Sequence, residues 1–175
     1  MVTPAQQNIS FYQASVPVFI RALTNLSSLL AKAQAHVQEQ GIEPAKWIDA
    51  RLAPDMFSLA RQVQSASDAA KSCGARLAAC EIPSFPDTET TFDELQARIA
   101  KTLTFLGNLR QEQFDHSGER PIVMNMRGTE KSFTGYDYLY QLALPNLFFH
   151  VTTAYDILRH QGLAIGKKDY LGSFE

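Results

Sequence analysis

The fold is decided by the stretch FTGYDYLYQLALPNLFFHVTTAYDILRHQG, Phe133–Gly162. Its apolar residues recur every three or four positions, which predicts one long helix. Pro145 lies inside this helix and cannot donate a backbone hydrogen bond, so the helix should bend near Gln141. Apolar residues fall on two opposite sides. We therefore expect one side to face the core and the other to lie against another helix or a second copy of the chain.

A polar stripe interrupts the first of these apolar sides. Asn146 and His150 are four residues apart, and Thr153 follows one turn later. Buried polar groups need partners, and Gln62 on a second predicted helix is the nearest candidate, with Asp55 as the acid that could pair with His150. Two interpretations stay open: a ligand or metal site inside the protein, or a core histidine that is hydrogen-bonded to Asn146 or to a backbone carbonyl. The candidate ligand-binding residues are His150, Asn146, Thr153 and Gln62, and no catalytic residue is assigned.

Three further helices are predicted along the chain, at about residues 8–40, 53–80 and 91–109. A turn of helix near residues 45–49 separates the first two, and Thr91–Glu94 has the spacing of a capping box. Alternating residues at 122–126 and 131–133 predict a short hairpin before the last helix. Four long helices without a parallel sheet favour an all-α, antiparallel four-helix bundle formed by a single domain, residues 1–175.

The apolar seam of the second helix runs through both cysteines, Cys73 and Cys80, so we predict two buried and inert thiols. The acids that cluster around the start of the third helix, Asp87 and Glu89 among them, are expected to favour its dipole. The residues predicted to be almost fully buried are Leu59, Val63, Leu103, Leu142 and Ile157.

Composition limits the classes of function. The 175 residues are 45% hydrophobic and 19% charged, which gives enough apolar mass for a sizeable core. The net charge of −2, without a basic cluster, argues against a nucleic-acid partner. No uninterrupted apolar run approaches the roughly 18 residues of a membrane span, and the first residues do not resemble a signal peptide. We therefore expect no membrane partner and a cytoplasmic location.

Four segments together resemble a known family: YQASVPVFIRALTNL, RLAPDMFSLARQVQSASDAAK, DTETTFDELQARIAKTL and the final helix quoted above. The family is one of uncharacterised bacterial proteins, a domain-of-unknown-function family within the DinB/YfiT-like superfamily. The resemblance covers about Ser10 to Gly172 and implies a four-helix bundle. Many members of the superfamily hold a divalent metal with three histidines, one on the second helix and two that lie four residues apart on the last. Several of these members are thiol-dependent transferases or hydrolases, and the superfamily often forms dimers.

This sequence departs from the three-histidine pattern. His150 matches a position of the last helix, but Ala154 stands four residues later and Asn146 four residues earlier, while Gln62 or Gln64 is nearest to the position on the second helix. Amides are poor ligands for zinc or nickel. We therefore predict no cofactor, with a divalent metal at His150 as the alternative.

Three functions remain open. The first is a non-catalytic or small-ligand-binding bundle that has lost the metal, which is the interpretation we favour. The second is a metal- or thiol-dependent transferase or hydrolase with a site around His150. The third is a dimeric structural or interaction module. A homodimer is expected because the last helix is apolar on two sides.

Overall fold

The computed structural model describes residues 9–126 and 128–174. Over this range the chain is mainly helical, with one two-stranded antiparallel sheet. The longer helices are α1 (Phe11–Glu39), α3 (Leu59–Leu77), α4 (Phe92–Gly107) and α6 (Leu144–His160). The shorter elements are α2 (Pro44–Ile48), η1 (Gln111–Phe114), β1 (Ile122–Met126), β2 (Thr129–Phe133), α5 (Gly135–Asp137), η2 (Tyr138–Ala143) and α7 (Lys167–Leu171).

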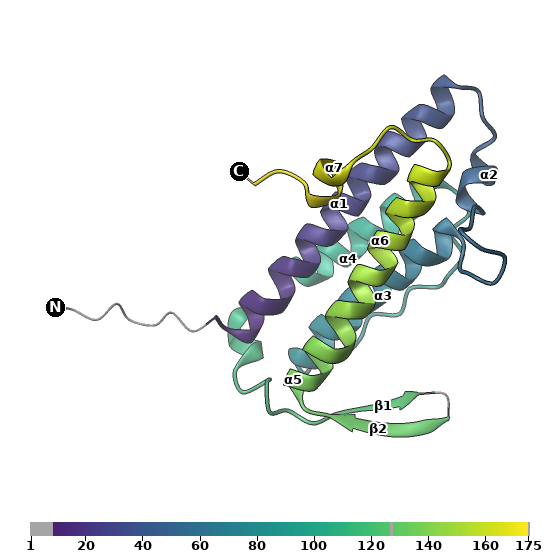
Figure 1. Cartoon of the computed structure of the whole chain (residues 1–175). Helices are drawn as coiled ribbons and strands as arrows, with labels where there is room; N and C mark the ends of the chain where they lie inside the picture. Colours follow the sequence, from purple (N-terminus) through teal and green to yellow (C-terminus); the bar gives the residue numbers. More distant parts are fainter. Residues whose placement is uncertain (1–8, 127, 175) are drawn as a thin grey trace.

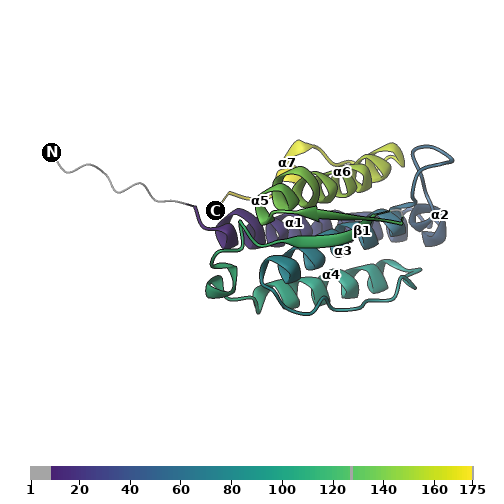
Figure 2. The same cartoon turned by 90° about the horizontal axis from the view of Figure 1, so that it is seen from below.

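The four longer helices lie side by side, with α4 and α6 on opposite sides of α1 and α3 (Figures 1 and 2). Helices α3 and α6 run in opposite directions, because Gln62 meets His150 near one end and Arg76 meets Tyr138 near the other. Helices α1 and α4 are also antiparallel, since Ser27 bonds Gln96 and the later Gln34 bonds the earlier Asp93.

Two other neighbouring pairs run in the same direction, so the predicted antiparallel arrangement does not hold for them. In α3 and α4, Ser67 meets Thr102, and farther along both helices Gly74 lies against Leu106. Helices α1 and α6 likewise rise together in Figure 1. The connection 78–91 makes this possible. Its 14 residues can extend over roughly 45 Å, which exceeds the roughly 28 Å length of α3.

Helix α3 begins at Leu59 and not near Ala53, as its apolar seam had suggested. Ser58 caps it, because its hydroxyl accepts from the backbone N–H of Arg61, and the residues before it form a loop. The helix ends before Cys80, where Ala79 has a φ of 51°. The Cys80 N–H bonds the Ala75 carbonyl at 3.0 Å, which completes a Schellman motif. Cys80 is therefore exposed, contrary to prediction, whereas Cys73 is buried.

Two other elements lie where short sequence motifs predicted them. Thr91 and Glu94 form the predicted capping box, with the two hydrogen bonds at 3.2 and 3.0 Å. The predicted hairpin is present, with Ile122 paired to Phe133. Its second strand starts two residues earlier than predicted, at Thr129.

Three of the five predicted core residues, Leu59, Val63 and Ile157, are buried, but Leu103 and Leu142 are only half-buried. On α4 the neighbouring Thr102 is buried and hydrogen-bonds Ser67, while Leu103 lies at the edge of a buried stripe whose other apolar residues are where the sequence predicted them. Leu142 lines the groove described below.

The C-terminal helix is continuous but not uniform. The N–H of Asp137 bonds the Thr134 side chain at the start, and residues 138–143 form a π-helix before Pro145. This π-helical segment lies where the bend was predicted, because Pro145 lacks the N–H group of one backbone hydrogen bond of the helix. The second apolar side of α6 packs against α1, which buries Val151 and Leu158.

By length and apolar composition alone, helix α1 also qualifies as a helix that could cross a membrane. Its buried stripe packs against α4 and α6, and core helices of globular proteins often pass the same test.

Candidate functional site

The site is built around a hydrogen bond between α6 and α3. His150 Nδ1 lies 2.7 Å from Gln62 Oε1, and the histidine is 8% exposed. The amide nitrogen of Gln62 donates to the carbonyl of Phe57 at 3.4 Å, which orients the amide oxygen toward the imidazole. An amide oxygen only accepts, so Nδ1 carries the proton and Nε2 holds the lone pair.

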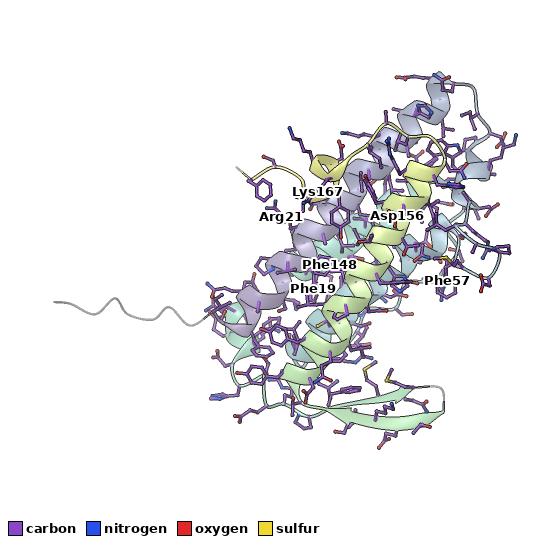
Figure 3. The ribbon with its side chains drawn as sticks, viewed as in Figure 1. Phe19, Arg21, Phe57, Phe148, Asp156 and Lys167 are labelled. Atoms are coloured by element: carbon purple, nitrogen blue, oxygen red, sulfur yellow. The ribbon has the colours of Figure 1, made fainter. Side chains whose placement is uncertain are left out.

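Two aromatic rings hold the imidazole in place. The ring of Phe57 stacks on it at 6.4 Å with an interplanar angle of 12°, and Phe149 meets it edge-on at 5.3 Å. Figure 3 shows Phe57 on the side of α6 away from Phe148 and Arg21. The imidazole therefore has a fixed orientation as well as a fixed tautomer.

His150 is held in the neutral form. Burial lowers its pKa, and the positive charge of Arg61 lowers it further. Asp55, the predicted acidic partner, is exposed on the loop before α3, and no ion pair joins it to His150 within the described residues. His150 lines the groove described below, and its Nε2 makes no hydrogen bond to any residue that the structure describes.

The two remaining predicted residues take different positions. Asn146 is exposed and lines the same groove as His150, one turn earlier. Thr153 is buried, but its hydroxyl donates to the Phe149 carbonyl at 2.7 Å and lies outside the groove lining. The structure thus places His150 and Asn146 on the groove, joins the buried Gln62 to His150 from outside the groove lining, and leaves Thr153 as a helix-internal contact.

The groove lies between α3 and the C-terminal helix and has a volume of about 400 Å³. Helix α3 supplies one wall and the π-helix with α6 the other, while Met124 and Met126 of β1 border one end. Its lining residues are Ser65, Asp68, Ala69, Ser72, Arg76, Met124, Met126, Tyr138, Leu142, Ala143, Asn146 and His150. Short π-helical turns occur frequently at functional sites, and here three residues of the turn line the groove.

Arg76 and Tyr138 form a second polar pair in this groove, at the end near the hairpin. Arg76 Nη1 donates to the Tyr138 hydroxyl at 3.0 Å, and the guanidinium lies 5.6 Å from the ring centroid. Burial raises the pKa of Tyr138 to about 12, although Arg76 acts in the opposite direction, so the hydroxyl keeps its proton at pH 7. Sequence reasoning missed this pair, because the two residues are 62 positions apart and lack a shared motif.

A buried ion cluster beside the groove was also missed. Arg98 on α4 is 1% exposed and pairs with Asp68 at 2.7 Å, Asp87 at 2.9 Å and Glu89 at 3.0 Å. Asp68 also pairs with Lys71 at 2.8 Å. Asp87 and Glu89, which were expected to favour the helix dipole, thus have specific partners that the sequence did not show, because both bind Arg98. An arginine between Leu95 and Ile99 of an apolar stripe was the available signal.

The donor set does not fit the three-histidine metal site. His150 is the one imidazole present, its Nδ1 is bonded to Gln62, and the neighbouring ligand positions carry Ala154 and Asn146. Among residues 9–126 and 128–174, no three histidine, cysteine or acidic side chains gather at metal-binding distance. Amides and one imidazole are a poor set for zinc or nickel.

Comparison with known proteins supports the family resemblance. No curated protein matches the chain. The fold is similar to a crystal structure of a DinB family member protein from Shewanella denitrificans, with a TM-score of 0.88 and 41% sequence identity. That match covers 93% of this chain and 92% of the other. A family model described as "Domain of unknown function (DUF1993)" matches residues 11–171, so the chain belongs to this family, within the DinB-like superfamily.

Proposed function

We propose that this protein is a DinB-like four-helix bundle that binds a small molecule in the groove between α3 and α6 without a metal. The observation that carries the proposal is the Gln62–His150 hydrogen bond at the groove, which leaves Nε2 of a neutral histidine available to a ligand. A groove with a few fixed polar groups among apolar residues is a common form of ligand site.

The packing supports the bundle. Each of the four longer helices contacts two or three of the others, and the core is continuous between them. The antiparallel pairs α3–α6 and α1–α4 and the parallel pairs α3–α4 and α1–α6 give an up-down-down-up order, in which the long 78–91 connection returns the chain to the end where α3 began.

The chemistry at His150 supports binding over metal-assisted catalysis. A metal would need ligands in addition to His150, and Gln62 and Asn146 offer only amides. The hydrogen bond also fixes the imidazole against rotation. The neutral Nε2 can accept a hydrogen bond from an O–H or N–H group of a ligand.

A fragment screen by protein-observed NMR tests the proposal, with a mixed set of small carboxylates, amines and neutral aromatic compounds as probes. Hits should shift the amide signals of Ser72 and Asn146. Ala69→Phe should abolish these shifts because the added ring occupies the groove, whereas Ala31→Phe, on the exposed side of α1, should leave them unchanged. If no fragment perturbs the groove, or if Ala69→Phe binds every hit as well as the wild type, the proposal is refuted.

Metal analysis of untagged protein distinguishes the transferase or hydrolase alternative. We expect substoichiometric metal that His150→Gln does not alter. One equivalent of a divalent metal, lost in His150→Gln while the helical content is retained, would favour the enzyme.

A further inference from the structure

We propose that the ligand of this groove is an organic carboxylate and that Arg76 and Tyr138 bind its anionic group. The inference rests on the proposed function, because it names the class of ligand for the same groove. It is carried by a different pair of residues from the His150–Gln62 contact.

The guanidinium of Arg76 has no ion-pair partner among the described residues. It lines the groove, half-buried, and its one hydrogen bond among the described residues goes to the hydroxyl of Tyr138. No carboxylate in residues 9–126 and 128–174 lies within ion-pair distance of it. Arginine presents several N–H donors in a fixed plane that matches the two oxygens of a carboxylate.

Tyr138 supplies a second donor that points to the same kind of ligand. The residue is 3% exposed, and its oxygen accepts the hydrogen bond from Arg76. Its O–H proton has no acceptor within the described part of the chain. Buried hydroxyl donors are normally satisfied, so a ligand oxygen beside Arg76 would complete both groups.

The acid in the groove lining does not compete for this position. Asp68 precedes Arg76 by eight residues on α3, which is about 12 Å along the helix axis. Its Oδ1 is bonded to Arg98 at 2.7 Å and to Lys71 at 2.8 Å. The Arg76 end of the groove is therefore locally positive.

The rest of the groove fits an uncharged ligand body. Ala69, Leu142 and Ala143 line its middle, and Met124 and Met126 can adapt to different shapes. Tyr138 and His150 are 12 residues apart, roughly 18 Å along the helix, so an elongated molecule can lie between them. Because His150 is neutral, the far end of the ligand would be a hydrogen-bond donor and not a second anion.

Isothermal titration calorimetry with octanoate and its neutral isostere octanamide tests the inference. Octanoate should bind the wild type at least about 10-fold more tightly than octanamide, since a hydrogen bond to a charged group is lost in the amide. Tyr138→Phe and Arg76→Gln should each weaken octanoate binding by about 10-fold or more and weaken octanamide binding much less, because the amide oxygen accepts only neutral hydrogen bonds there. The matched controls are Tyr140→Phe, on the exposed side of the same helix, and Arg159→Gln, at the far end of α6; both should bind octanoate like the wild type.

Equal binding of octanoate and octanamide, absence of octanoate binding, or equal effects of the test and control variants would each overturn the inference. Tyr138→Phe keeps the packed ring, so it decides the question even if Arg76→Gln fails to fold. Neutral fragments that occupy the groove in the NMR screen, combined with no preference for the carboxylate, would refute this inference and leave the proposed function standing. A groove that no fragment occupies would refute both.

Discussion

Replacing Arg98 with methionine should be among the most destabilising single changes in this protein. The guanidinium is 1% exposed and is held by all three of its nitrogens: Nη2 pairs with Asp68 and Asp87, Nη1 bonds Glu89 and the Pro86 carbonyl, and Nε bonds Ser67 Oγ. Burial by itself would lower the pKa of Arg98, but the hydrogen bonds that Arg98 donates to Glu89 and the charge of Asp68 outweigh it and raise that pKa. The cation is thus stabilised in place and connects α3, the 78–91 connection and α4.

The expected loss is about 3–5 kcal/mol of unfolding free energy, the usual cost of removing one partner from a buried ion pair. The partly exposed carboxylates limit the loss, because Asp68 and Asp87 are about a third exposed and keep Lys71 and Arg61 as partners. Glu89 is only 12% exposed and loses its cation, although Gln64 still donates to it. The estimate therefore belongs at the lower end, near 3 kcal/mol.

Urea unfolding followed by circular dichroism measures this loss. Arg159→Met is the control, because Arg159 is exposed at the end of α6 and makes one hydrogen bond, to the Leu163 carbonyl, so its loss should cost about 1 kcal/mol or less. Arg98→Lys should fall between the two, since lysine keeps the charge but not the planar set of donors. A loss below 1 kcal/mol in Arg98→Met would refute the reasoning, because it would mean that the cluster is solvated and contributes little.

Further predictions concern the core, the histidine and association. Leu59→Ala should lower the unfolding free energy by roughly 2–5 kcal/mol, because Leu59 is fully buried and leaves a cavity; a loss well under 1 kcal/mol in urea unfolding would contradict its place in the core. Because the pKa of His150 is lowered by folding, the unfolded chain protonates this histidine at a higher pH than the folded chain does. The contribution of the neutral imidazole to the unfolding free energy is therefore present above about pH 6.5 and lost as pH falls below it. His150→Gln should flatten that part of the plot of stability against pH, and an unchanged plot would count against a buried neutral imidazole. We also propose a homodimer, since Phe149 and Tyr140 remain 55% and 52% exposed on the C-terminal helix; light scattering that gives 19.5 kDa at micromolar concentration would exclude it.

Much of the fold could be predicted from the sequence because its signals are local. Helical periodicity predicted the longer helices, Thr91 and Glu94 predicted a helix start, and Pro145 predicted the irregular turn that became η2. A helix boundary depends on residues a few positions apart, which the sequence shows directly. The start of α3, predicted near residue 53 from its apolar seam, was set at Leu59 by the side-chain cap of Ser58.

The candidate site could also be predicted from the sequence only in part. The sequence marked His150 and Gln62 as polar residues on helix faces that needed partners, and the structure joins them at 2.7 Å. It could not show that Tyr138 meets Arg76, nor that Arg98 collects acids from the connection and from α3, because these contacts depend on the direction in which each helix runs. The length of the 78–91 connection permits either direction for α4. Only the tertiary packing, which aligns Ser67 with Thr102 and Gly74 with Leu106, decided that α3 and α4 are parallel.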